Sequence, residues 1–363
     1  MELQRPPRWR RLLKGALASA IWRARALPLP MPGAGRPLVL GYHRVVEDLD
    51  EAAKTDMPTM LTSRAMFERH IDWIGRHFDF VSLDEVGARL ESGEPFTRPV
   101  AAITFDDGYR DVCEQALPVL ARKGIPATMF VVTELVGRTD WQIHDRLYHL
   151  LDKAYGRWSD PWRGLSRLLA DADLCADTIP GMRAASRNPY QAVTTLLPAL
   201  SQAHTDRVMD VLDAQIGNGT AAVPRTVTWP MLADMVRQGF TIGSHTKTHV
   251  WLANESDEKD FDELTGSKQE LEQRLGISIR HFAYPGGQFT PHVVDLVARA
   301  GYDYAYTACE HRVDAYPALT IERLLLWEGS SIGADGSFSS AIFNCQTHGL
   351  WPPARHCERV HAA

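Results

Sequence analysis

One short segment, Thr104–Gly108, constrains the fold and the chemistry of this chain more than any other. It reads Thr-Phe-Asp-Asp-Gly and follows the apolar run 100–103, a pattern typical of a buried strand. Neighbouring side chains of a strand point to opposite faces, so Asp106 and Asp107 can approach one pocket only where the strand ends. Gly108 permits the backbone turn that this requires. The segment therefore predicts a strand that ends in a pair of carboxylates.

Two histidines, His245 and His249, stand four residues apart much further along the chain. That spacing puts both imidazoles on one side of a helix or of a wound loop. One carboxylate and two imidazoles can hold Zn²⁺ or a similar ion and leave coordination positions open for water and substrate, while a second carboxylate stays free as a base. Either motif alone is often structural. Together they favour a metal-dependent hydrolase.

Apolar runs that predict strands alternate with stretches at helical spacing along most of the chain. The expected strands are 38–43, 80–83, 100–105, 126–132, 240–243, 281–284, 304–307 and 321–326. Such alternation predicts a parallel sheet, either open or closed into a barrel. The polar candidates follow the carboxyl ends of these strands, which is the edge where both architectures build their sites.

The strand and helix pattern also divides the chain into parts. Residues 1–37 are expected to form a basic amphipathic N-terminal segment and a Pro/Gly linker, and 38–330 the main domain. The alternation breaks over 141–220, where a helical pattern predicts an inserted cap or subdomain. Residues 331–363 are expected to form a C-terminal extension.

The N-terminal segment carries an uneven share of the charge. Residues 1–25 hold seven basic residues and one acidic residue, whereas the whole chain has a formal charge of -6. Three interpretations stay open: a helix that contacts an anionic membrane surface through residues 8–25, a signal peptide, or an ordinary helix. No run of 18 apolar residues exists, so no membrane-spanning helix is expected. The mild overall acidity is not that of a typical nucleic-acid binder.

The five cysteines are widely spread and include no Cys-x-x-Cys pair. This pattern predicts neither a disulfide framework nor a cysteine zinc site, and it favours a reducing compartment. We therefore expect a cytoplasmic or membrane-peripheral protein, and an extracytoplasmic location stays open as the alternative.

Thr104–Gly108 and His245–His249 together resemble the first two motifs of the polysaccharide deacetylase family (carbohydrate esterase family 4, the nodulation-factor deacetylase homology domain). The segment around His43, Tyr-His-Arg, is similar to the exopolysaccharide-type branch. The resemblance runs from about residue 38 to about 325 without the insert. It implies that the chain folds as a distorted (β/α) barrel and that it is an enzyme that removes an acetyl group from a sugar. It also implies Asp106 as the catalytic base.

The same resemblance implies a divalent metal held by Asp107, His245 and His249, with zinc foremost and cobalt, nickel or manganese as alternatives. Its third motif corresponds to 282–287, so Tyr284, Pro285 and Gly286 are expected at the substrate, with the Gly286 N–H at the oxyanion.

Two departures from the family pattern concern the catalytic groups. Ala283 stands at the usual arginine position, so another residue must orient Asp106, and Arg323 is the candidate. The histidine of the last family motif is not recognisable. His43 is therefore the candidate proton donor, with a buried structural histidine as the alternative. His144, in the insert, is a further group that could reach over the mouth of the site.

These observations predict a metal-dependent hydrolase that removes an acetyl group from an N-acetylated sugar of a polysaccharide or glycan precursor. The expected partner is an acetylated amino-sugar glycan or its precursor, and no nucleic acid. One alternative is a hydrolase of another non-peptide C–N bond, of the cyclic amide type, on the same fold. The other is a sugar-binding protein that has lost turnover.

Overall fold

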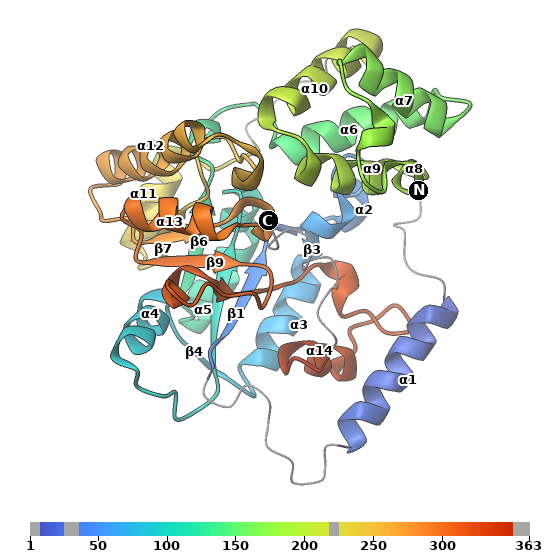
Figure 1. The fold of residues 1–363 in the computed structure, drawn as a ribbon. Coiled ribbons are helices and arrows are strands. Elements are labelled where there is room, and N and C mark those ends of the chain that lie inside the picture. The colour runs from blue at the N-terminus through green and yellow to red at the C-terminus, as the bar shows by residue number, and fades with distance from the viewer. Residues whose placement is uncertain (1–7, 25–35, 218–224, 351–363) are drawn as a thin grey trace.

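The computed structural model describes residues 8–24, 36–217 and 225–350. A parallel sheet of nine strands curls into a nearly closed barrel, and helices surround it (Figure 1). The strands follow the order β10-β9-β8-β7-β6-β5-β1-β11, with β4 beside β5. The distorted (β/α) barrel expected from the sequence is therefore confirmed.

The strands of this sheet are β1 (Leu38–Tyr42), β4 (Asp79–Phe80), β5 (Val100–Phe105), β6 (Ala127–Val131), β7 (Thr241–Ser244), β8 (His281–Ala283), β9 (Tyr304–Thr307), β10 (Ile321–Glu322) and β11 (Leu324–Leu325). The helices around it are α3 (Arg64–Ile74), α4 (Leu83–Ser92), α5 (Leu117–Lys123), α11 (Trp229–Arg237), α12 (Asp257–Leu275) and α13 (Pro291–Arg299).

Strand β5 lies inside the sheet and carries the paired carboxylates at its end. All six of its residues are buried, and it pairs with β1 on one side and β6 on the other. A parallel strand that is covered on both faces reads as a continuous apolar run, which is why 100–103 was recognisable in the sequence.

The barrel closes at residues 321–325, where the sequence pattern predicts one strand over 321–326. The structure has two short strands instead, because the chain changes partner there. Strand β10 pairs with β9 at one end of the sheet, and β11 pairs with β1 at the other. Arg323 lies between them and is only 3% exposed. The closure therefore brings a charged side chain into the barrel.

A second, small parallel sheet lies beside the barrel. It joins β2 (Arg44–Val46) to β3 (Leu61–Ser63). The intervening residues include the short helix α2 (Leu49–Ala52), although their polar sequence predicts no regular element. The pairing of β2 with β3 is a long-range contact, so local residue preferences carry no signal for it.

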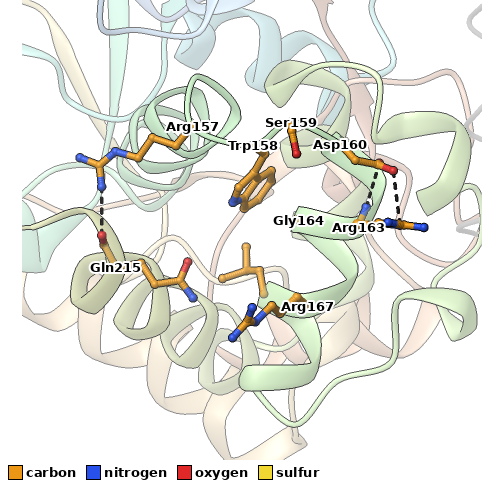
Figure 2. A pocket seen from close by; sticks show the side chains of 9 residues that line it. Arg157, Trp158, Ser159, Asp160, Arg163, Gly164, Arg167 and Gln215 are labelled. Carbon is orange, nitrogen blue, oxygen red and sulfur yellow. Dashed lines mark hydrogen bonds and ion pairs between the residues drawn. The ribbon is translucent and has the colours of Figure 1, made fainter.

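The helical insert forms its own layer at one end of the barrel (Figure 1). Its helices are α6 (Ile143–Tyr155), α7 (Pro161–Asp171), α8 (Met182–Ala185), α9 (Pro189–Leu196) and α10 (Gln202–Ile216). A surface pocket of about 510 Å³ opens between α7, α10 and the loop before α7, and Trp158 and Arg167 are among its lining residues (Figure 2). None of the candidate catalytic residues lines this pocket.

The two ends of the described chain pack on each other. Helix α1 (Arg8–Ala24) contacts α14 (Ser340–Thr347), with Ala18 buried against Ile342 and Cys345. Most of the expected linker, and residues 351–363 of the expected C-terminal extension, lie outside the described residues. Among the described residues, no helix combines the length and the apolar character that crossing a membrane requires.

Candidate metal centre and catalytic carboxylate

The candidate residues meet at the carboxyl-terminal edge of the barrel sheet. Asp106 and Asp107 follow β5. His245 follows β7, which is separated from β5 in the sheet by β6 alone. The Nε2 atoms of His245 and His249 lie 3.5 and 3.3 Å from Asp107 Oδ1. Side chains separated by well over one hundred residues in the sequence thus gather at one point.

Asp107 adopts a backbone conformation that residues other than glycine rarely take. Its φ is 68°, in the left-handed region, which costs roughly 1 kcal/mol or more for such a residue. The Gln142 side chain, buried in the insert, donates a hydrogen bond of 2.7 Å to the Asp107 carbonyl oxygen. The insert therefore helps to hold the backbone turn at Asp107.

Residues 245–249 form a tight loop after β7, and no helix. Thr246 and His249 have φ values of 67° and 61°, so this loop is strained as well. Glu263 of α12 is fully buried and accepts hydrogen bonds of 2.8 and 2.9 Å from the N–H groups of residues 247–248. Nothing in the sequence set Glu263 apart from the other acids of α12, because its role depends on how the helix packs.

The orientation of His245 is fixed by its second ring nitrogen. His245 Nδ1 lies 2.7 Å from the carbonyl oxygen of Ala283, so it carries the proton and donates it, and Nε2 faces Asp107 with a free lone pair. Burial lowers the pKa of His245 to about 4, so the imidazole is neutral near pH 7. A neutral imidazole anchored in this way is the usual form of a metal-binding histidine.

The polar atoms at this point fit a bound cation. Asp107 is 1% exposed, and neither of its carboxylate oxygens accepts a hydrogen bond of ordinary geometry from the described residues. A buried carboxylate without such partners is costly unless a positive charge compensates it. Asp107, His245 and His249 therefore present a donor set for Zn²⁺ or a related ion.

A third imidazole, which the sequence only weakly suggested, also reaches Asp107. His144 of α6 is 4% exposed, and its Nε2 lies 3.6 Å from Asp107 Oδ2. Asp107, His144 and His249 each offer a ligand atom within 4.8 Å of those of the other two. Burial lowers the pKa of His144 to about 3, so this imidazole is neutral as well. Its Nε2 also contacts the Tyr109 hydroxyl at 2.8 Å.

Asp106, the other carboxylate, is held by Arg323. The guanidinium donates two hydrogen bonds, from Nη1 to Oδ1 at 2.6 Å and from Nη2 to Oδ2 at 2.8 Å. Burial by itself would raise the pKa of Asp106, but the charge and hydrogen bonds of Arg323 outweigh it and hold that pKa below its usual range. The Nε2 of His43, which is partly exposed, lies 4.0 Å from Asp106 Oδ2.

The turn 284–286 adjoins the same site through Trp251. Gly286 has a φ of 64°, and a Cβ added to it would lie 2.5 Å from the Trp251 indole nitrogen, so only glycine fits there. The Trp251 ring in turn lies 5.0 Å from the His249 ring. The Tyr284 hydroxyl donates to the carbonyl oxygen of Leu319 at 3.0 Å, away from the carboxylates. Pro285 is buried within the turn.

Comparison with known proteins adds a family to this geometry. The family model described as polysaccharide deacetylase matches residues 93–158 and 185–305. The match includes both aspartates and the three histidines around Asp107, whereas His43 and Arg323 lie outside it.

Among curated proteins, the chain is similar to the poly-beta-1,6-N-acetyl-D-glucosamine N-deacetylase of Staphylococcus aureus. The two are 30% identical over 118 residues, which is 30% of this chain. The matched segment spans 40% of the length of that relative.

Two solved structures share the fold. The deacetylase PplD of Streptococcus pyogenes, in complex with acetate, has a TM-score of 0.52 and 18% identity, and the match covers 83% of this chain and 95% of that one. IcaB from Ammonifex degensii has a TM-score of 0.51 and 20% identity, with 83% and 96% covered.

Proposed function

Because this chain belongs to the polysaccharide deacetylase family, we propose that it is a metal-dependent hydrolase that removes the acetyl group from an N-acetylated sugar. The observation that carries this proposal is the different surroundings of two adjacent carboxylates. Asp106 accepts two hydrogen bonds from Arg323, while the carboxylate of Asp107 faces imidazoles and accepts no ordinary hydrogen bond from the described residues. One carboxylate is thus suited to act as a base and the other to bind a cation.

In this proposal, Asp107, His245 and His249 hold the divalent cation, and zinc is the first candidate because carboxylate and imidazole ligands suit it. The cation would polarise the acetyl carbonyl and make water a better nucleophile at neutral pH. The neutral imidazole of His245 supports this role, since it offers a lone pair without first losing a proton.

Asp106 takes the proton of the attacking water. Its low pKa keeps it ionised over the neutral range, and Arg323 fixes the direction of its carboxylate. The Gly286 N–H is the proposed donor to the developing oxyanion, because the turn 284–286 adjoins His249 through Trp251. His43, beside Asp106 and partly open to solvent, is the proposed donor of the proton that the leaving amine requires.

The proposed substrate is an N-acetylated amino sugar in a polysaccharide or a glycan precursor. The name of the Staphylococcus aureus relative, a deacetylase of poly-beta-1,6-N-acetyl-D-glucosamine, supports this class. The test is to measure acetate release from N-acetylglucosamine oligomers of different linkage, with and without a chelator, and after adding back zinc, cobalt, nickel or manganese. Acetate release that chelation stops and one of these ions restores is the expected result.

Two alternatives predict other outcomes in the same assay. A hydrolase of cyclic amides would open such rings and leave the acetylated sugars intact. A sugar-binding protein without turnover would bind the oligomers and release no acetate with any of the four ions. Asp106→Asn is the matched control, because it removes the proposed base while it changes the size of the side chain very little.

A membrane-surface contact through residues 8–25 is a separate part of the proposal. Leu12, Leu13 and Leu17 of α1 are each more than half exposed, in a segment rich in basic residues. Apolar side chains among basic ones favour adsorption to anionic lipid. Sedimentation with anionic and neutral vesicles tests this. Binding to anionic vesicles that Leu13→Glu and Leu17→Glu together abolish would support the contact, and no sedimentation with either vesicle would exclude it.

A further inference from the structure

The helical insert reaches the candidate metal centre through one segment, residues 142–144 at the start of α6. Gln142, 1% exposed, donates to the Asp107 carbonyl oxygen. Two residues later, the His144 imidazole faces the other side of the same aspartate. A cap that only covered the entrance would have no need to place two buried polar side chains on Asp107.

The three imidazoles approach the Asp107 carboxylate from two sides. His245 and His249 lie nearest Oδ1, at 3.5 and 3.3 Å, whereas His144 lies 3.6 Å from Oδ2. Ligand atoms about 2.0 to 2.1 Å from a zinc ion, in a tetrahedral arrangement, are roughly 3.3 Å from one another. The His144 nitrogen is therefore at a separation from Asp107 similar to that of the other two.

We propose that His144 is a further protein ligand of the cation held by Asp107, His245 and His249, so that the insert completes the metal centre. The inference rests on the proposed function, because it requires a cation at this site. It goes beyond that function, which needs only one carboxylate and two imidazoles. Catalytic zinc sites can reach five-coordination, so a fourth protein ligand still leaves a position for water or substrate.

Tyr109 competes with a cation for the same nitrogen of His144. Its hydroxyl lies 2.8 Å from His144 Nε2 and donates to Asp145 Oδ2 at 2.7 Å. Since the single hydroxyl proton goes to the carboxylate, the 2.8 Å contact requires a proton on His144 Nε2, which donates to the Tyr109 oxygen. His144 can bind a cation through Nε2 only when its proton is on Nδ1 instead, and the hydrogen bond to Tyr109 is then lost. Removing the Tyr109 hydroxyl therefore frees the nitrogen, whereas removing His144 eliminates a ligand.

The experiment measures zinc affinity by competition with a chromophoric chelator, and the visible spectrum of the Co²⁺-loaded full chain. His144→Gln is expected to weaken zinc binding at least about tenfold and to change the Co²⁺ absorption, because loss of a ligand should cost no less than loss of an outer-shell partner. Tyr109→Phe is expected to bind zinc as tightly as the parent or more tightly. His149→Gln, on the same helix and half-buried against Trp141, is the matched control and should leave both readouts unchanged.

The inference is overturned if His144→Gln loses less than about tenfold in zinc affinity and keeps the parent Co²⁺ spectrum. It is also overturned if Tyr109→Phe loses as much zinc affinity as His144→Gln, because His144 would then act only as a hydrogen-bond partner of Tyr109. Circular dichroism of the metal-free variants checks that they fold, and His144→Asn is the second variant if the first does not. His249→Ala separates the two proposals. If it loses zinc while His144→Gln retains it, the proposed function stands and only this inference fails. If His249→Ala retains zinc, the metal centre itself is misassigned.

Discussion

Arg323 holds Asp106 with two parallel hydrogen bonds, 2.6 and 2.8 Å long, and both side chains are almost completely buried. Arg323 lies between β10 and β11, the two short strands at opposite ends of the barrel sheet. The residue that orients the proposed base is thus part of the segment that closes the barrel. Closure of the fold and orientation of Asp106 depend on the same five residues, 321–325.

Replacing Arg323 should therefore damage catalysis without removing the cation. Arg323→Ala is expected to lower kcat/KM about 100-fold, because the base loses its fixed direction. It should also lower the free energy of unfolding by roughly 3 to 5 kcal/mol, the usual cost of leaving one partner of a buried ion pair alone. Steady-state kinetics measure the loss of kcat/KM, metal analysis checks that zinc is retained, and urea unfolding measures the loss of stability.

Arg323→Lys is the matched control for this pair. Lysine keeps the charge but cannot make the two parallel hydrogen bonds, so activity between that of the parent and that of Arg323→Ala is expected. Parent-like kcat/KM in Arg323→Ala would show that Asp106 needs no such anchor. Loss of zinc together with activity would place Arg323 in the metal centre instead.

Mutation should distinguish the roles of the two adjacent carboxylates, Asp106 as the base and Asp107 as the metal ligand. Asp106→Asn keeps the shape of the side chain but cannot take a proton, so acetate release is expected to fall about 10²- to 10⁴-fold while zinc content stays at the parent value. Asp107→Asn should lose zinc and activity together. If both variants lose zinc, or if Asp106→Asn stays active, the division of roles is wrong.

The role of His43 as proton donor can be tested with two substrates that differ in their leaving group. An amine must be protonated to leave, whereas the phenolate of an activated aryl acetate leaves without help. We therefore expect His43→Gln to slow hydrolysis of an N-acetylated sugar about 100-fold or more and of p-nitrophenyl acetate less than about threefold. Asp106→Asn serves as the control, since it should slow both substrates. Equal losses on both substrates in His43→Gln would assign His43 a structural or base-related role.

Much of this site was predictable because its signals are local. The apolar run 100–103 followed by Asp106 and Asp107 marks both a strand and the residues at its end, and the spacing of His245 and His249 marks a ligand pair. Arg323 emerged from the sequence only because Ala283 stands where an arginine was expected. The bidentate contact itself depends on closure of the barrel, which no local pattern describes.

The contributions of Gln142 and Glu263 could not be predicted in the same way, and for His144 the sequence indicated only that it could reach over the mouth of the site. Gln142 reaches the carbonyl of a residue 35 positions away, and Glu263 supports the histidine loop from the middle of α12. Gln142 directly precedes α6 and Glu263 lies within α12, and an isolated polar residue of an amphipathic helix usually faces solvent. Only the packing of α6 and α12 against the barrel shows that these side chains are buried and used.

The last prediction concerns His70, a buried histidine of α3 that lies outside the catalytic site. Its Nδ1 and Nε2 contact the hydroxyl of Tyr42 at 3.2 Å and that of Ser331 at 2.7 Å, and its ring stacks on Phe343. Burial lowers the pKa of His70 to about 3 in the folded state, whereas an exposed histidine has a pKa near 6.5. Between these values the unfolded chain binds a proton that the folded chain does not bind. The contribution of His70 to stability is therefore present above pH 6.5 and is lost as the pH falls toward 3.

At pH 5 this loss should be about 2 kcal/mol relative to pH 7.5. Urea unfolding of the parent and of His70→Gln at both pH values measures it. The variant is expected to be less stable than the parent at pH 7.5, because it loses packing and a hydrogen bond. Its stability should nevertheless fall by about 2 kcal/mol less on acidification, since glutamine does not titrate. The other buried histidines contribute equally to both proteins and cancel in the comparison. Parallel pH profiles for the two proteins would show that His70 is protonated in the folded state.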